Sequence, residues 1–555
     1  MVCRTAVRQL VLSSLYCRDA KRMNIDLIIR RGTVVDGTGS EPFAADVAVS
    51  NGRICDVGSI PSLEGVPTLD ASGLLVTPGF IDIHSHSDFT LIVDPRAISS
   101  VTQGVTLEVV GNCGHGCAPI ADVSLARSNI YGCEVSHEID WRTMAGYLER
   151  LESGRPAVNV LSLVPNGNLR LAVAGLVDRP STAEELKQMQ RLLAQGLEEG
   201  AFGFSTGLEY STELACSEKE IQALCSVAAG AGGLYATHTR NRQGEAKETI
   251  AEAIRAGAAA QVPVQISHIS VVSRLAEDGH WAVEQALAQV DEARARGLDV
   301  GFDMHTRLFG TTNLSAALPP WALAGDKAEI ASKLRDPRLR EQIRNYPSII
   351  TALARGDWRR IVVFHSQSQP QFSRRSLAEI SEARGTDLFD TICDLLLAEM
   401  DDLHNLMVIA FTYRSEDIRQ AFEHPHCMVG SDATALAPDG PLAGKSFHGA
   451  YTWASWFFRH FVREARLLTS QEAVRRLTSL PAARFGLVDR GWIRTGAWAD
   501  IAVFNPAEFG EQGTTFEPNQ IARGMTHVLV NGVATMKDGK LTGERAGQVL
   551  RHSKR

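Results

Sequence analysis

The amino-acid sequence predicts an α/β protein: a (β/α)₈ TIM barrel with a small β-sandwich domain formed by both termini and an insertion subdomain between strands 7 and 8. Three observations predict this architecture. Eight short apolar segments alternate with amphipathic helical segments in the middle of the chain. Both ends carry apolar runs separated by Asp-Gly and Asn-Gly pairs. A long segment, residues 306–426, separates the seventh apolar segment from the eighth.

The composition is that of an ordinary globular protein. Hydrophobic residues make up 44% of the 555 residues and charged residues 22%, which excludes a wholly disordered chain. The net charge of −8 argues against nucleic acid or an anionic membrane as the main partner. No apolar run approaches the ~18 residues needed to span a bilayer. Ten scattered cysteines without paired CxxC motifs favour a reducing, cytoplasmic location over a disulfide scaffold.

The two ends of the chain are predicted to build one β-sandwich. Residues 24–75 supply its N-terminal part and residues 486–550 its C-terminal part, because both contain hairpin-like runs. Two unrelated sets of hairpins are the less favoured alternative. Residues 1–23 are expected to be a disordered extension, since their apolar core is too short for a convincing signal peptide.

The middle of the chain, residues 76–485, is predicted to form the barrel. Near-continuous apolar strands alternating with helices are typical of a parallel sheet covered on both faces, and eight such units indicate closure. Two of the helices are expected to begin with capping boxes, Ser181-x-x-Glu184 and Ser217-x-x-Glu220. The predicted strands are residues 80–86, 106–113, 158–164, 201–206, 234–238, 262–268, 298–305 and 427–432.

An insertion subdomain is placed at about residues 308–405, between the last two strands. The segment contains two apolar runs, residues 360–366 and 405–412. These runs could instead be barrel strands, and that alternative would change the strand numbering.

Residues of the types that bind metals lie at the ends of several predicted strands. Side chains at positions i and i+2 share one face of a strand, so His84 and His86 should both point into the barrel. Active sites of (β/α)₈ barrels form at the C-terminal ends of the strands, so we expect six such side chains to converge at one mouth. Imidazole, thiolate and carboxylate groups are the ligands of zinc. The six residues are His84, His86, Cys113, His238, His268 and Asp432.

A single histidine near a strand end is more often an ordinary core residue. The repetition of ligand-type residues at later strand ends favours the metal interpretation for these six. Four further histidines could approach the mouth without carrying the argument alone: His115, His305, His365 and His448.

Several motifs resemble a known family. PGFIDIHSHSD (78–88), VVGNCG (109–114) and FGFSTGLEY (202–210), with ISH, THTR and GSDA at later strand ends, resemble the amidohydrolase superfamily and, within it, the N-acyl-D-amino-acid deacylase (D-aminoacylase) group. The resemblance extends from about residue 25 to residue 551. It implies a zinc-dependent hydrolase on a metal-dependent barrel, which cleaves non-peptide C–N bonds of linear amides. Metal-activated water would attack the amide carbonyl, with Asp432 as the general acid and base.

The resemblance also implies an arrangement of metal ligands. Cys113, His238 and His268 would hold one zinc ion tightly, and His84, His86 and Asp432 would complete a second, weaker site. Other superfamily members bridge two metals with a carbamylated lysine on the fourth strand. No lysine occurs here between Lys21 and Lys187. Cys113 therefore takes the bridging role by resemblance, as a soft thiolate ligand.

The substrate-binding residues depart from the pattern of the group. Tyr210 matches a substrate-contact tyrosine, but Ser270 stands where the group has a lysine. Residues 447–450 read Phe-His-Gly-Ala where the group has an arginine for the substrate carboxylate. Arg307 or Lys445 could replace these cations, because a guanidinium binds both carboxylate oxygens. The candidate substrate contacts are Tyr210, His305, Arg307 and His448.

The expected partner is a small-molecule amide, and a homo-oligomer remains open. A neutral or cyclic amide or carbamate is an alternative substrate, since the lysine and arginine of the group are missing. A non-catalytic scaffold is the least favoured interpretation, because all six ligand residues are present.

Overall fold

The structure is a computed structural model that describes residues 25–131, 137–240, 246–269 and 279–553. The predicted extension at residues 1–23 lies outside the described residues, and so does Ser270. Within the described residues, no helix is both long enough and apolar enough to cross a membrane.

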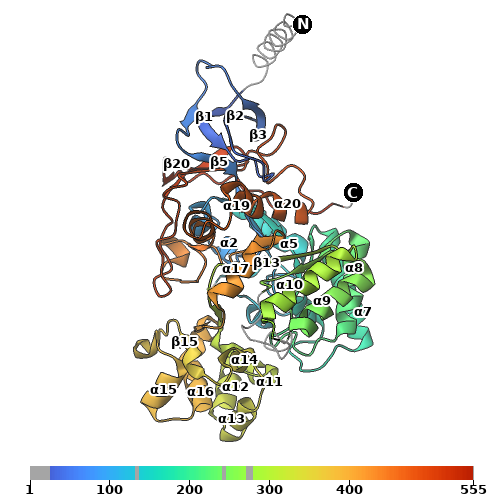
Figure 1. Cartoon of the computed structure of the whole chain (residues 1–555). Helices are drawn as coiled ribbons and strands as arrows, with labels where there is room; N and C mark the ends of the chain where they lie inside the picture. The colour runs from blue at the N-terminus through green and yellow to red at the C-terminus, as the bar shows by residue number, and fades with distance from the viewer. Residues whose placement is uncertain (1–24, 132–136, 241–245, 270–278, 554–555) are drawn as a thin grey trace, which may run out of the picture.

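Eight parallel strands form the barrel, as predicted (Figure 1). They make two hydrogen-bonded sets, β6-β7-β8 and β17-β13-β12-β11-β10-β9, in which β8 and β9 are one strand interrupted at Leu163. The sets are joined on one side by the bond from Phe202 N to Ser162 O and on the other by a parallel bridge between Ser85 and Ala433. The barrel strands are β6 (Phe80–Asp82), β7 (Val105–Val110), β8 (Asn159–Ser162), β9 (Val164–Pro165), β10 (Gly203–Gly207), β11 (Leu234–His238), β12 (Val264–Ile266), β13 (Val300–Met304) and β17 (Cys427–Val429).

Helices cover the outside of this barrel. Every residue of β10, β11 and β13 is buried, as expected for strands of a parallel sheet that is covered on both faces. The helices that connect or follow the barrel strands are α2 (Thr90–Val93), α3 (Ile98–Val101), α4 (Val123–Arg127), α5 (Met144–Gly154), α6 (Asn166–Val173), α7 (Ala183–Glu198), α8 (Glu218–Ala231), α9 (Ala246–Ala260), α10 (Ala282–Ala295), α17 (Ser415–Glu423), α18 (Trp453–Phe458), α19 (Ser470–Leu477) and α20 (Ser479–Arg484).

One of the two predicted capping boxes is correct and the other is wrong by one residue. Ser217 and Glu220 cap α8 as expected. At α7 the box is formed by Thr182 and Glu185 instead of Ser181 and Glu184. The two registers have equally good capping residues, and the backbone N–H of Ser181 is instead bonded to Glu220, which fixes the later start.

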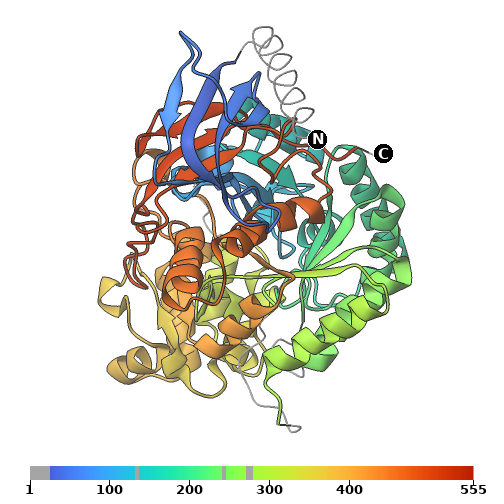
Figure 2. The same cartoon turned by 45° about the horizontal axis from the view of Figure 1, so that its top comes forward.

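Both ends of the chain build one β-domain (Figure 2). Its strands form a single sheet in the order β21-β20-β19-β18-β5-β1-β2-β3, and β4 pairs with β1. Val47 from the N-terminal part and Ile501 and Leu529 from the C-terminal part share one core. The predicted boundary after residue 75 falls inside β5, which joins the two parts. The strands are β1 (Leu27–Val34), β2 (Phe43–Ser50), β3 (Arg53–Gly58), β4 (Thr68–Asp70), β5 (Leu75–Pro78), β18 (Ile501–Phe504), β19 (Met525–Val530), β20 (Val533–Lys537) and β21 (Lys540–Leu541).

The insertion lies at the opposite end of the molecule from the β-domain (Figure 1). Its strands pair antiparallel in the order β14-β16-β15, apart from the barrel, so the two ambiguous apolar runs belong to the insertion. Leu334, Ile392 and Val408 contribute to a separate hydrophobic core. Its elements are β14 (Gly310–Asn313), α11 (Pro320–Leu323), α12 (Lys327–Arg335), α13 (Pro337–Arg344), α14 (Ile349–Ala354), β15 (Ile361–Val363), α15 (Leu377–Arg384), α16 (Leu388–Ala398) and β16 (Met407–Ala410).

Candidate metal centre

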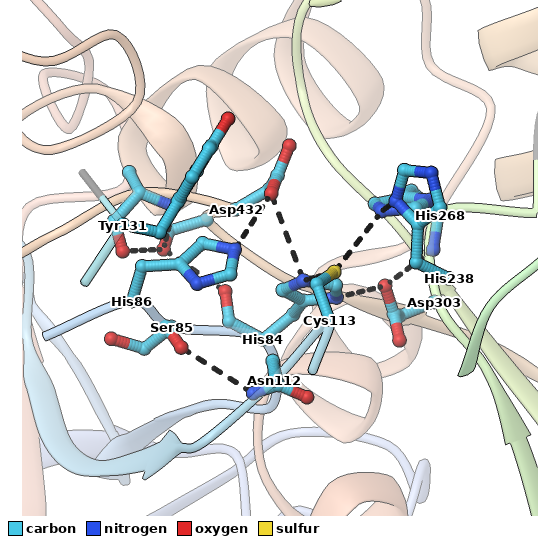
Figure 3. A network of polar contacts seen from close by, with 12 residues as sticks. His84, Ser85, His86, Asn112, Cys113, Tyr131, His238, His268, Asp303 and Asp432 are labelled. Carbon is cyan, nitrogen blue, oxygen red and sulfur yellow. Dashed lines mark hydrogen bonds and ion pairs between the residues drawn. The ribbon is translucent and has the colours of Figure 1, made fainter. Parts of the chain in front are cut away.

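The structure brings all six predicted ligand side chains together at the C-terminal mouth of the barrel (Figure 3). Each comes from the end of a barrel strand or from the first residues after it. Five of the side chains are almost completely buried, and that of Asp432 is 14% exposed. Such burial of titratable groups is unusual unless they are paired or bind a metal. The strands involved are β6 for His84 and His86, β7 for Cys113, β11 for His238, β12 for His268 and β17 for Asp432.

Three of these residues have a left-handed backbone conformation. The φ angles are 53° at Cys113, 36° at His268 and 45° at Asp432. A residue that carries a side chain rarely adopts this conformation, and each instance costs about 1–3 kcal/mol. All three lie just beyond a strand end, where the chain turns over the mouth. The strain is therefore concentrated at the residues that aim donor atoms at one place.

The first group of donor atoms comes from His84, Cys113 and His268, which all lie within 4.8 Å of one another. Cys113 Sγ lies 3.2 Å from His84 Nε2 and 3.5 Å from His268 Nε2. His238 Nδ1 lies 3.2 Å from His268 Nε2. Ligands on a tetrahedral zinc ion, at the usual bond lengths, would be separated by about 3.3 Å for two nitrogens and about 3.6 Å for nitrogen and sulfur. The donor set fits the ion that the sequence predicts.

The second group of donor atoms comes from His84, His86 and Asp432 and lies directly beside the first. Asp432 Oδ1 is 3.3 Å from His86 Nε2 and 3.6 Å from His84 Nε2. The buried Nε2 of His86 makes no hydrogen bond of good geometry with a described residue. Buried polar atoms are normally satisfied, and a cation between His86 and Asp432 would satisfy this nitrogen. His84 belongs to both groups.

The thiol and the carboxyl group of the cluster are both held in their ionised forms. Burial raises the pKa of the Cys113 thiol, but the imidazoles of His84 and His268 outweigh it and hold this pKa well below its usual range. Burial likewise raises the pKa of Asp432, yet the close contact with the His86 imidazole and the charge of Arg307 hold it well below its ordinary value. The thiolate and the carboxylate are the ligand forms of these groups.

Two carboxylates orient the histidines from behind, and sequence analysis did not identify either role. Asp303 Oδ1 lies 3.1 Å from His84 Nδ1 and accepts a hydrogen bond from the backbone N–H of His268. Glu209 Oε2 lies 3.0 Å from His238 Nε2. Carboxylates in these positions fix which ring nitrogen faces a metal. Both residues lie near the C-terminal ends of strands, at the end of β13 and just after β10, and that position is the signal that could have found them.

A cavity opens beside the metal-type cluster. Its apolar wall comes from α14 of the insertion, through Ile349, Ala352 and Leu353. Sequence analysis did not identify these residues or three further ones, because each contacts the mouth only through the tertiary arrangement. Those three are Tyr131, Thr311 and Tyr413. The ring of Tyr131 lies 4.5 Å from the ring of His86.

The predicted substrate contacts divide into two pairs. Tyr210 and His305 line the cavity, and the Tyr210 ring lies 4.9 Å from that of His238. Arg307 lies behind Asp432, to which it donates a 2.9 Å hydrogen bond. The ring of His448 packs on Phe364, and its Nε2 faces the carbonyl of Thr515.

The remaining candidates lie at different distances from the mouth. Lys445 and His365 line a separate cavity, where the ammonium of Lys445 is 3.7 Å from Asp402. His115 packs between the rings of Tyr131 and Tyr210 and so lies at the mouth.

Comparison with known proteins identifies the family. The model of the Amidohydrolase family matches residues 68–343 and 407–541, and the unmatched residues 344–406 lie in the insertion. The chain belongs to the Amidohydrolase family. The resemblance predicted from the motifs is thereby confirmed, and with it the barrel architecture of this amidohydrolase.

The chain is similar over most of its length to three deacylases. This amidohydrolase is 33% identical to the N-acyl-D-glutamate deacylase of Alcaligenes xylosoxydans xylosoxydans, over 95% of this chain and 96% of that protein. The crystal structure of D-aminoacylase superposes with a TM-score of 0.78 at 30% identity, covering 95% of this chain and 100% of that one. The N-acyl-D-glutamate deacylase of Bordetella bronchiseptica, complexed with zinc and a phosphonate that mimics the tetrahedral intermediate, gives a TM-score of 0.77 at 29% identity, with the same coverage.

Proposed function

We propose that this amidohydrolase is a zinc-dependent deacylase that cleaves the linear amide bond of N-acyl-D-amino acids. The observation that carries the proposal is the convergence of six metal-type ligand residues beside a cavity that Tyr210, His305 and Asp432 help to line. The relatives support the substrate class, because they are D-aminoacylase and N-acyl-D-glutamate deacylases. They favour this substrate over a neutral or cyclic amide, and they argue against a non-catalytic scaffold.

The donor set defines which residues would hold the metal. Cys113, His238 and His268 would bind the tighter zinc ion, and His84, His86 and Asp432 the weaker one. Zinc supplies two things when bound: it lowers the pKa of water to about 7, and it polarises a carbonyl oxygen.

Asp432 would move the proton of the reaction. Its ionised carboxylate takes a proton from the attacking water and delivers it to the nitrogen of the leaving amine. The carbonyl carbon gains the hydroxyl group, the C–N bond breaks, and the products are a carboxylic acid and a free amino acid. Asp432 lines the cavity, so its carboxylate can reach both water and leaving group.

The cavity walls suit an amide with an apolar substituent. Ile349 and Leu353 present aliphatic surface, while the ring of Tyr210 covers His238. An aromatic and aliphatic lining with a few polar groups is typical of small-molecule sites.

The proposed function is tested by assaying the zinc-loaded protein against matched N-acetyl-D- and N-acetyl-L-amino acids with apolar and acidic side chains. We expect free amino acid to be released from the D-isomers, measured by chromatography. Cyclic amides and neutral anilides serve as the comparison set. Hydrolysis of these compounds without hydrolysis of any N-acyl-D-amino acid would reject the proposal.

Glu209 provides a test of the metal centre itself. We expect Glu209→Ala to weaken binding of the tighter zinc ion by about 10- to 100-fold, because His238 loses the carboxylate that orients its ring. Competition with a chromophoric chelator measures the affinity. Glu209→Gln keeps an acceptor oxygen and should lose less. Unchanged zinc affinity in Glu209→Ala would show that His238 needs no such support.

We also propose a cytoplasmic location. The seven cysteines that the structure describes are all free thiols, which is the usual state in a reducing compartment. A homo-oligomer stays a prediction.

A further inference from the structure

Arg307 is a buried cation that the proposed reaction does not use. It follows β13, and its side chain is only 5% exposed. The guanidinium donates four hydrogen bonds, three to Ser431 and Asp432 just after β17 and one to His448 further along the chain. Nη1 donates to Ser431 O at 2.6 Å and His448 O at 2.8 Å, and Nη2 donates to Asp432 O at 3.0 Å and Asp432 Oδ2 at 2.9 Å.

The two carboxylate oxygens of Asp432 have different partners. Oδ2 is held by Arg307, whereas Oδ1 faces His84 and His86. The same guanidinium also holds the backbone carbonyl of Asp432, whose φ of 45° lies in the strained left-handed region. Arg307 therefore fixes both the side chain and the main chain of this residue.

Gly449 makes room for the guanidinium. Its φ is +93°, and a Cβ atom at this position would clash with Arg307 Nη1 and lie 2.8 Å from Ser431 O. Gly449 falls in the Phe-His-Gly-Ala segment that departs from the pattern of the D-aminoacylase group. Arg307, a candidate replacement for the missing cations, and the departing segment after strand 8 thus belong to one arrangement.

We propose that Arg307 is a positioning residue that presents Oδ1 of Asp432 to the weaker metal site and to the substrate, and that it is not the cation that binds a substrate carboxylate. The proposal rests on the proposed function for its kinetic consequences. Asp432 lines the cavity, and Arg307 is not among the cavity residues. Turning the guanidinium toward a substrate would break bonds to three buried carbonyl oxygens and leave Asp432 without its partner.

The test compares Arg307→Lys and Arg307→Met with the wild-type enzyme on an N-acyl-D-amino acid and on its neutral carboxamide. We expect kcat on the acid to fall by about 100-fold in Arg307→Met, with little change in KM, because general acid–base catalysis depends on the aim of Asp432. Arg307→Lys should lose about 10-fold, since one ammonium cannot reproduce the fork of the guanidinium. If the enzyme also cleaves the carboxamide, kcat on that compound should fall by the same factor in each variant.

A second readout does not depend on catalysis. Calorimetric titration with Zn²⁺ should show the Asp432-containing site weakened by about 10-fold or more in Arg307→Met, with the Cys113-containing site unchanged. Gly449→Ala should reproduce both effects, because it displaces the guanidinium without removing it. In an Asp432→Asn background, Arg307→Met should cause no further loss of kcat.

Several outcomes would overturn the proposal. They are a loss confined to KM for the acid with kcat unchanged, unaltered zinc affinity at the Asp432 site, or an equal additional loss in the Asp432→Asn background. Arg170→Met controls for the removal of a buried arginine, since Arg170 is paired with Glu220 on the outer layer of the barrel. A wild-type enzyme that cleaves no N-acyl-D-amino acid would reject the proposed function, while the zinc titration would still decide the role of Arg307.

Discussion

Asp432→Asn is expected to lower kcat by about 10²- to 10⁴-fold while the fold remains intact. Asparagine has the size of aspartate and can still accept a hydrogen bond from Arg307, so the loop after β17 should keep its conformation. It cannot take a proton from water, however. The pKa of Asp432 lies well below its ordinary value, so the wild-type carboxylate is the basic form throughout the neutral range. Steady-state kinetics and circular dichroism of the variant measure the two halves of this prediction.

A matched control separates the loss of the base from a general effect of removing a carboxylate. Asp402 belongs to the separate cavity, where it lies 3.7 Å from Lys445. Asp402→Asn should have wild-type kinetics. If Asp432→Asn turned over substrate at a rate near that of this control, Asp432 would have no part in proton transfer.

The fold and the convergence of the six candidate ligand residues could be predicted because both follow from local patterns. Buried strands such as β11 and β13 show no polar–apolar alternation. The strand β6 ends at Asp82, so His84 and His86 lie just beyond the strand whose periodicity was expected to place them. The C-terminal ends of parallel strands meet at one mouth, so strand order alone brings Cys113 and Asp432 together. The orientation of Cys113, His268 and Asp432, in contrast, depends on left-handed turns just beyond the strand ends, which these patterns do not predict.

The contacts behind the ligands could not be predicted in the same way. Arg307 reaches Asp432 across two loops, and only the glycine at 449 leaves space for it. The sequence shows Arg307 and Gly449 separately but not their contact. The apolar wall formed by Ile349 and Leu353 poses the same problem, because it depends on how the insertion packs over the mouth. Tertiary arrangement decides both features.

Small shifts in local structure escape prediction for a different reason. Ser181 and Thr182 are both competent helix caps, and each has a glutamate three residues later. Thr182 is the N-cap in the structure because the backbone N–H of Ser181 donates a hydrogen bond to Glu220 of the neighbouring helix. Glu220, which is distant in sequence, therefore decides between two equally good local capping signals.

Cys113→Ala is expected to weaken the tighter zinc site by at least about 100-fold, more than the loss of an orienting carboxylate would. Its sulfur lies 3.2 Å from His84 Nε2 and 3.5 Å from His268 Nε2, so the substitution removes a donor of the first group. The sequence contains no lysine between Lys21 and Lys187 that could serve as the bridging ligand in place of Cys113. Elemental analysis after dialysis against a chelator measures the zinc retained.

The control for that substitution is Cys117→Ala, because Cys117 is equally buried only four residues away. Burial raises the pKa of its thiol, whereas the imidazoles beside Cys113 keep that thiol ionised. Cys117→Ala should therefore retain zinc and activity, since a buried neutral thiol is only a small apolar side chain. Equal zinc retention in the two variants would mean that the thiolate at position 113 is not a ligand. Loss in Cys113→Ala alone would tie metal binding to the one cysteine that the histidines ionise.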